Sequence, residues 1–223
     1  MNHLRMLIRA RRNPCALLLV VQLAGLLLYP FVEKTPVGHT VLGVFGILVL
    51  VLAVVMVRRA PWLTGVSVAL AVPAMVLLAL QALFDMPQLL LWSALLEAAF
   101  YFHAAGGLIM YMLEDRNATS DELFAAGATF TLLAWAFTNV FIAAQILQPG
   151  CFTAAVNPQA QRSWSELMYL SFALLSSTGI GDVVPVTVHA RALASAEMFT
   201  GVMYLATVVS RLIGLTLVQQ RKE

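Results

Sequence analysis

The sequence contains few charged residues, few histidines and only two cysteines. Asp, Glu, Lys and Arg make up 11% of its 223 residues, whereas 61% are hydrophobic, which exceeds what a soluble domain of this size can bury. The four histidines are dispersed without metal-ligand spacing or an evident nucleophile nearby. The small net charge of +2 gives no indication of a nucleic-acid partner. The composition therefore indicates an all-α integral membrane protein and not an enzyme.

Six apolar runs are each close to the roughly 20 residues that cross a bilayer. They cover about residues 15–32, 38–57, 62–84, 88–112, 122–147 and 190–218. A further run, 164–176, is too short to span, and it ends at a glycine-rich turn. The run lengths predict six transmembrane helices, with a re-entrant half-helix between the fifth and the sixth.

The basic residues predict the orientation of these spans, because Lys and Arg accumulate in cytoplasmic loops. With the N-terminus inside, only Lys34, Arg162 and Arg191 fall outside. The other ten fall on or near the cytoplasmic side: Arg5, Arg9, Arg11, Arg12, Arg58, Arg59, Arg116, Arg211, Arg221 and Lys222. We therefore predict a multi-pass protein of the plasma or inner membrane with both termini in the cytoplasm. No small-residue cleavage pair occurs at 28–33, which favours an uncleaved first span over a signal peptide.

This topology separates the two cysteines. Cys15 lies near the cytoplasm and Cys151 in the outer loop, which excludes a disulfide within one chain. We expect Cys151 to be an unpaired surface thiol, with a cross-link between subunits as the alternative.

The fourth span has no Lys or Arg between Gln88 and Leu113. Voltage sensing needs several charges that move through the membrane field, each worth about 2.3 kcal/mol per 100 mV. We therefore expect the first four spans to lack an arginine-based voltage sensor.

The turn that follows the short run reads Ser177-Thr178-Gly179-Ile180-Gly181-Asp182. Irregular backbone occurs at membrane depth only where protein buries it or where it lines a path for water and ions. Turning successive carbonyls to one side requires positive φ at alternate positions, which favours the two glycines. The turn therefore predicts a cation filter built from the backbone oxygens of 178–181 and the Ser177 hydroxyl, with Asp182 at its outer mouth.

The segment from Tyr169 to Asp182 resembles the pore helix and filter of potassium channels, and the resemblance extends over residues 122–218. Pro185, Thr187 and Arg191 fall where prokaryotic six-span members often carry these residue types, and Gly201 falls where their inner helix has its hinge glycine. The resemblance implies a homotetramer that conducts potassium ions, with no other cofactor. The regions implied are a basic N-terminus 1–14, a four-helix domain 15–113, a linker 114–121, a pore domain 122–218 and a tail 219–223. Within the pore domain, the pore helix covers 164–176, the filter 177–182 and the inner helix 190–218. No soluble regulatory domain is expected.

Three residues depart from the family's usual Thr-Val-Gly-Tyr-Gly-Asp. Ser177 replaces the Thr, Thr178 replaces the Val and Ile180 replaces the aromatic residue that packs outward to hold the filter width. The Thr178 hydroxyl must find a hydrogen-bond partner or admit water. Potassium selectivity is therefore the first expectation, and a weakly selective sodium and potassium channel is the alternative.

Other residues of the membrane spans have two interpretations each. Gly201, Val202, Leu205 and Val209 recur at helical spacing and either line an apolar lower pore or face neighbouring helices. The ionisable Glu97, His103 and Glu197 lie near hydrocarbon depth, where such groups are functional or paired. We interpret Glu97 with His103 as a proton sensor or as structural, and Glu197 as a hydrogen-bond partner of the pore helix or of a neighbouring subunit. The ionisable His189, beside the outer mouth, is a second proton-sensing candidate.

Two other classes remain as alternatives. A secondary transporter typically has inverted repeats with broken helices in both halves, whereas this sequence has one re-entrant segment. A non-conducting membrane scaffold would place the same helices in the bilayer without an ion path. A cation flux through the purified protein in liposomes, blocked by barium, distinguishes a channel from both.

Overall fold

The computed structural model describes residues 14–32, 38–57, 61–84, 86–114, 120–211 and 213–214. Several predicted regions therefore lie outside the described residues. They are most of the N-terminal segment 1–14, most of the linker 114–121, the end of the predicted inner helix beyond 214 and the tail 219–223.

The described chain is almost entirely helical, as the apolar runs predict. Its long helices are α2 (Pro14–Val32), α3 (Gly38–Val57), α4 (Pro61–Phe84), α5 (Leu90–Glu114), α6 (Ser120–Leu147) and α8 (Val188–Tyr204). Shorter elements are η1 (Pro87–Leu89), β1 (Phe152–Ala154), α7 (Trp164–Leu175), β2 (Val183–Pro185) and the π-helix η2 (Leu205–Val209).

Five of the described helices are long and apolar enough to cross a membrane. They are Pro14–Val32, Thr64–Gln81, Leu90–Leu113, Asp121–Leu147 and Val188–Val209. The predicted second span corresponds to α3. Within this helix, the stretch Phe45–Val54 is apolar but shorter than the five candidate spans. The protein is therefore a multi-pass membrane protein, with five candidate spans in the part of the chain that the structure describes.

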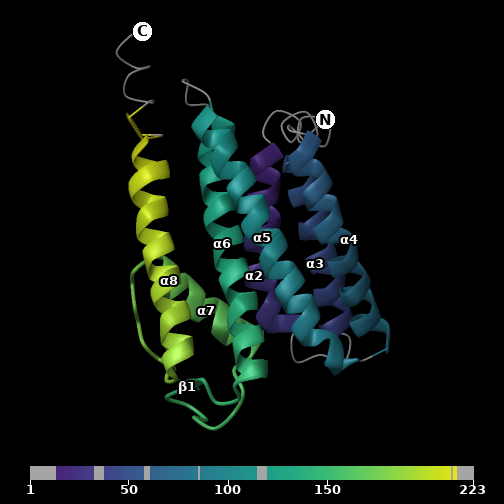
Figure 1. Cartoon of the computed structure of the whole chain (residues 1–223), viewed down its shortest axis with the longest axis vertical. Helices are drawn as coiled ribbons and strands as arrows, with labels where there is room; N and C mark the ends of the chain where they lie inside the picture. Colours follow the sequence, from purple (N-terminus) through teal and green to yellow (C-terminus); the bar gives the residue numbers. More distant parts are fainter. Residues whose placement is uncertain are drawn as a thin grey trace.

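The helices stand side by side, with α8 at one edge of the molecule and the pair α3 and α4 at the other (Figure 1). Helix α6 lies between α8 and the first four helices, where it packs against both α2 and α5. The backbone amide of Cys15 donates to Asp121 Oδ1 over 3.1 Å, which joins the N-terminal ends of α2 and α6. Acidic side chains stabilise helix N-termini, so one carboxylate serves both helices.

The core of the molecule lies around α6. The stretch 131–139 of this helix is buried at every position, as expected for a helix surrounded by other helices. Trp135 packs edge-on against Tyr101 of α5, with ring centroids 5.7 Å apart, and against Trp164, the first residue of α7, at 5.6 Å. The ring of Tyr29 of α2 stacks on Trp164, with ring centroids 4.3 Å apart. These rings tie the first four helices directly to the start of the short helix α7.

Helix α7 lies between α6 and α8 and occupies only part of their length (Figure 1). The segments on either side of it form a two-stranded antiparallel sheet, with Phe152 opposite Pro185 and Ala154 opposite Val183. The sequence analysis predicted no strands, because each consists of only three residues and pairs across a separation of about 30 positions. The sheet brings the segment after α6 next to the segment after the predicted filter.

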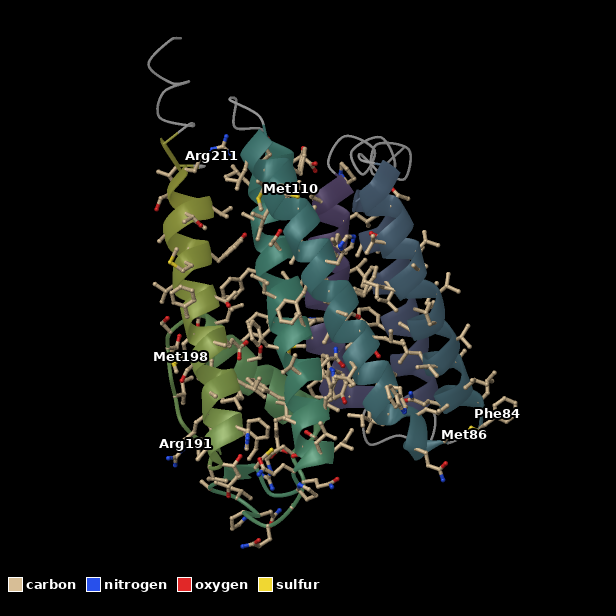
Figure 2. All side chains as sticks on the ribbon, viewed as in Figure 1. Phe84, Met86, Met110, Arg191, Met198 and Arg211 are labelled. Atoms are coloured by element: carbon tan, nitrogen blue, oxygen red, sulfur yellow. The ribbon has the colours of Figure 1, made fainter. Side chains whose placement is uncertain are left out.

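Helix α8 begins at Val188, two residues before the predicted start, because the Thr187 side chain accepts from the backbone amide of Ala190 and caps the helix. Figure 2 shows Arg191 and Arg211 near opposite ends of this segment. Arg191 Nε donates to Pro185 O over 3.2 Å, and Arg211 donates to Met112 O at the end of α5 over 2.6 Å. The two arginines thus anchor the segment formed by α8 and η2 near both of its ends.

Candidate ion-conduction site

The N-terminus of α7 carries a complete capping box. The Ser163 hydroxyl accepts from the Glu166 amide, and Glu166 Oε2 accepts from the Ser163 amide over 2.7 Å. The sequence Ser-x-x-Glu before an apolar run is the signature of this arrangement. It fixes the position at which α7 begins and therefore the register of everything that follows.

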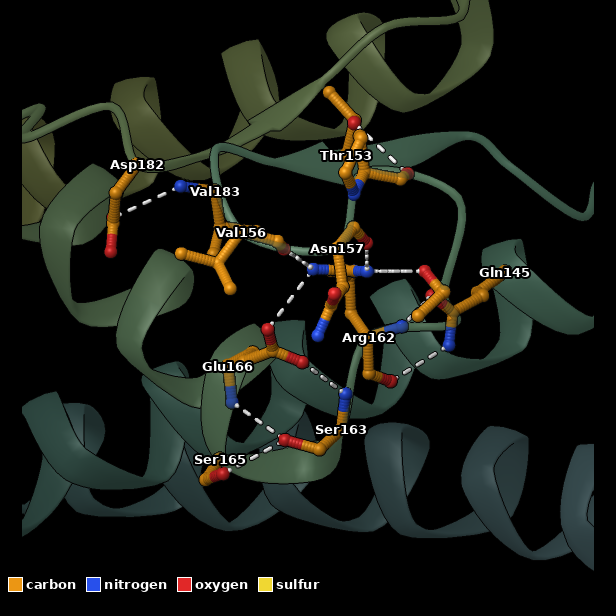
Figure 3. Close-up of polar contacts among 12 residues, drawn as sticks. Gln145, Thr153, Val156, Asn157, Arg162, Ser163, Ser165, Glu166, Asp182 and Val183 are labelled. Carbon is orange, nitrogen blue, oxygen red and sulfur yellow. Dashed lines mark hydrogen bonds and ion pairs between the residues drawn. The ribbon is translucent and has the colours of Figure 1, made fainter.

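Arg162, directly before the cap, is a buried anchor that the sequence analysis placed outside without assigning it a role. Its side chain is 2% exposed and pairs with Glu166 at 3.1 Å. The guanidinium also donates to the backbone oxygens of Val156, Asn157 and Ala160, and both backbone polar groups of Arg162 bond the Gln145 side chain (Figure 3). The spacing Arg-x-x-x-Glu across a helix start could have indicated the ion pair from the sequence.

We expect Arg162→Ala to loosen the outer loop. Removing one partner of a buried ion pair costs about 3 kcal/mol, and here it also leaves three backbone oxygens without their donor. Amide hydrogen exchange at 155–161 should accelerate by about a hundredfold. Arg191→Ala is the matched control, because Arg191 is exposed and its side chain bonds the backbone oxygen of Pro185. Equal exchange in both variants would contradict the anchoring role.

The C-terminus of α7 leads directly into the predicted filter through a Schellman motif. The amide of Ser177 donates to Leu174 O over 3.0 Å, and the amide of Thr178 donates to Ala173 O over 2.9 Å. This motif places its residue after the cap in the left-handed region, where glycine is usual. Here that residue is Ser177, with φ of 58°. The helix end and the start of the predicted filter therefore share one residue.

The positive φ values alternate along the turn, at Ser177, Gly179 (61°) and Gly181 (83°). This is the alternation that a row of carbonyls turned to one side requires. The two glycines mark only two of the three positions, so the positive φ of Ser177 could not be predicted from the residue type. A residue with a Cβ adopts this conformation at a cost of about 1 kcal/mol, which the two Schellman bonds offset.

The Thr178 hydroxyl, which departs from the family pattern, has a partner. Thr178 Oγ1 lies 2.7 Å from Ser176 Oγ, which in turn donates to Phe172 O over 2.6 Å. Since Ser176 has one hydroxyl proton, Thr178 is the donor to Ser176. Ile180 is exposed in the single chain, so no side chain of the described residues covers it as the family's aromatic residue would be covered.

Asp182 lies at the end of the turn. Its Oδ1 accepts from the Val183 amide over 2.9 Å, and its backbone oxygen accepts from the Ala155 amide over 3.1 Å. Asp182 also lines a shallow pocket of about 300 Å³ together with Glu166 and Tyr169 of α7 and the loop 154–156. The end of the turn is thus hydrogen-bonded to the segment that follows β1.

Gly201 of α8 lies against the end of α7. A Cβ at this position would be 2.0 Å from the backbone oxygen of Leu175, a distance that no side chain tolerates. The helix remains α-helical through Tyr204 and becomes a π-helix at Leu205–Val209. The structural reason for glycine at 201 is therefore close packing, and the irregularity of the helix lies one turn later.

The four predicted pore-lining residues lie on α8 and η2 and differ in burial. Val202 and Leu205 are exposed, whereas Gly201 is buried and Val209 packs partly against the core. Val202 and Leu205 are thus available to a pore or to a neighbouring subunit, and the pore-lining role stays a prediction.

Glu197 is fully buried, and its Oε1 contacts the hydroxyl of Ser171 on α7. Of the other ionisable candidates, the structure does not bring Glu97 and His103 into contact. Six residues apart on α5, they lie on different faces of the helix. His189 is exposed at the start of α8.

Cys151 is not the surface thiol that the sequence analysis expected. It is a free cysteine, buried in a small core with Phe141 and Phe152. Burial raises the pKa of the Cys151 thiol. Both properties disfavour a cross-link through this residue in the folded chain.

The chain was compared with known proteins. A family model described as ion channel matches residues 98–217, which is more than half of the chain. The chain belongs to this ion channel family. The match confirms the resemblance to potassium-channel pores and begins earlier than predicted, inside α5 instead of at residue 122. No curated protein and no solved structure matches the chain.

Proposed function

We propose that this channel protein is a homotetramer that conducts monovalent cations, with potassium preferred, through the turn 177–181. The observation that carries the proposal is the alternating positive φ of Ser177, Gly179 and Gly181, directly after a capped 12-residue helix and within the family match. In this reading the backbone oxygens of 178–181 and the Ser177 hydroxyl replace the water shell of the ion. Asp182 concentrates cations at the outer mouth.

The proposed assembly is supported by the geometry of one turn together with the family resemblance. One turn supplies one strand of a filter, whereas a ring of carbonyls needs several, and the resemblance to potassium channels implies four copies around the conduction path. The exposed apolar side chains of α8, among them Phe199, Val202 and Leu205, would then face neighbouring subunits or the pore. We place α7 and the turn as a re-entrant segment between the fifth and sixth of six spans, open to the outside, with both termini in the cytoplasm.

Helix α7 contributes to conduction through its electrostatics. Its C-terminal end, at Leu175, directly precedes the filter, so the partial negative charge of the helix terminus favours a cation in the cavity below. The capping box and the Arg162 anchor hold the opposite end of the helix in place. The ions are cargo, and no resident cofactor is proposed.

A weakly selective sodium and potassium channel is the second candidate. The exposed side chain of Ile180 favours this candidate, because none of the described residues packs over it. A filter whose width is held less firmly at this position distinguishes ions of different size less well. Against it stands the satisfied Thr178 hydroxyl, which does not need to recruit water into the filter.

Ion flux through purified protein in liposomes tests the proposal. Under bi-ionic potassium and sodium conditions we expect a reversal potential far from zero, a current blocked by barium, and a mass in detergent of four chains. A reversal potential near zero would favour the weakly selective channel. A flux that is coupled to a second substrate, or no flux at all, would favour a transporter or a scaffold.

A further inference from the structure

Behind the filter, three helices meet at the side chain of Ser171. The Ser171 hydroxyl lies 2.8 Å from the backbone oxygen of Ala134 on α6, and it also contacts Glu197 Oε1 on α8. All three residues are buried. These contacts therefore join α6, α7 and α8 at one point. On α8 this point is Glu197, which lies four residues before Gly201.

Counting protons assigns the direction of these two hydrogen bonds. A serine hydroxyl has one proton, and a backbone carbonyl oxygen can only accept. If Ser171 donates to Ala134 O, the second bond can form only when Glu197 carries a proton and donates it to Ser171 Oγ. If Glu197 were ionised, Ser171 could satisfy only one of its two neighbours, and the other contact would join two acceptors.

The second carboxyl oxygen leads to the same assignment. Glu197 Oε2 is buried and has no hydrogen-bond partner among the described residues. A buried carboxylate without a partner is far more costly than a neutral carbonyl oxygen in the same place. In the part of the chain that the structure describes, neither arginine near the ends of α7 and α8 pairs with Glu197, because Arg191 bonds Pro185 O and Arg162 pairs with Glu166.

We propose that Glu197 is a neutral hydrogen-bond donor that positions the pore helix, and with it the filter, by binding Ser171. Ser171 lies between the capped start of α7 and its Schellman end at Ser177. The bond holds the helix laterally against α8, whereas the capping box holds it at its outer end. The positioning role rests on the proposed conduction through the turn 177–181. The protonation state of Glu197 is independent of that proposal.

Infrared spectroscopy tests the neutral acid directly. At neutral pH the wild-type protein should show the carbonyl band of a protonated carboxylic acid that disappears in Glu197→Gln. If Glu197→Gln removes only carboxylate bands, the assignment of a neutral donor is wrong. This measurement requires folded protein and no ion current, so its result is independent of the proposed function.

Matched variants test the positioning role. Glu197→Gln keeps a neutral donor and should leave the potassium-to-sodium permeability ratio within about twofold of the wild type, whereas Glu197→Leu should lower the ratio about tenfold. Ser171→Ala removes the acceptor and should lower it similarly, and Ser171→Ala with Glu197→Leu should be no worse than either alone. Ser195→Ala, an exposed hydroxyl of α8 that bonds Arg191 O, is the control.

The outcomes separate the two proposals. A ratio in Glu197→Leu and Ser171→Ala equal to that of the wild type would overturn the positioning role while leaving the channel function intact. If the wild-type protein carries no cation current, the proposed function fails. The infrared band and the unfolding temperatures of the same variants, with rescue by Glu197→Gln, then decide whether the Glu197 bond exists.

Discussion

Replacing Gly201 with alanine will disrupt the packing of the inner helix against the pore helix. The added Cβ would lie 2.0 Å from Leu175 O and 2.7 Å from Leu175 C, both backbone atoms that cannot move without displacing the end of α7. Inserting one carbon into a packed interior usually costs about 1–3 kcal/mol, and a backbone clash lies at the upper end or beyond. Since Leu175 lies two residues before the proposed filter, we expect loss of conduction as well as of stability.

The unfolding temperature and the yield of assembled protein in detergent measure this effect. Gly106→Ala is the control, because Gly106 lies inside α5 and a Cβ there meets nothing within 4 Å. At that position alanine should be neutral or stabilise the helix by about 0.5–1 kcal/mol.

The same comparison separates packing from hinge bending at Gly201. A hinge glycine replaced by alanine leaves the fold intact and changes the fraction of time the pore is open. A packing glycine replaced by alanine lowers stability in every state. An unfolding temperature of Gly201→Ala equal to that of the wild type would contradict the packing role. It would also remove the argument that this helix bends at the π-helix Leu205–Val209 and not at Gly201.

The long helices could be predicted from the sequence because their lengths are set by the bilayer. The run 38–57 coincides with α3, and the predicted pore helix 164–176 ends one residue beyond the observed end at Leu175. Uninterrupted apolar sequence between polar loops leaves few other arrangements, since backbone groups in hydrocarbon must be satisfied within the helix.

What the sequence could not predict depends on contacts between distant segments. The burial of Arg162 requires the carbonyl groups of the loop 156–160 to converge on it, which no local pattern encodes. The π-turn after Tyr204 lies within a continuous apolar run, so the pattern of side chains gave no sign of the change in period. Cys151 became buried because β1 and β2 pair across the turn and cover it.

Gly179→Ala should abolish potassium conduction while leaving the protein folded. Gly179 has φ of 61°, and a Cβ there would meet nothing within 4 Å, so the cost is conformational and not steric. This cost is about 1 kcal/mol or more in each chain, and four chains would share one filter. The variant chain avoids it by rotating φ to a negative value, which redirects the residues that follow.

The hydrogen bonds at the turn indicate what this rotation changes. The amide of Gly179 donates to Ala173 O over 3.1 Å, together with the amide of Thr178, so the backbone up to residue 179 is fixed to the pore helix. Rotation at 179 therefore moves Ile180 and Gly181 relative to that fixed part. Their carbonyl oxygens would leave the row that faces the ion.

We expect potassium flux through Gly179→Ala to fall about a hundredfold or more, with an unfolding temperature close to that of the wild type. Ile180→Val is the matched control, because Ile180 does not have positive φ and the substitution alters one methyl group of an exposed side chain. A Gly179→Ala channel with wild-type conductance and selectivity would mean that the carbonyls of this turn do not coordinate the ion. Loss of flux without loss of fold would instead favour conduction through the alternating backbone.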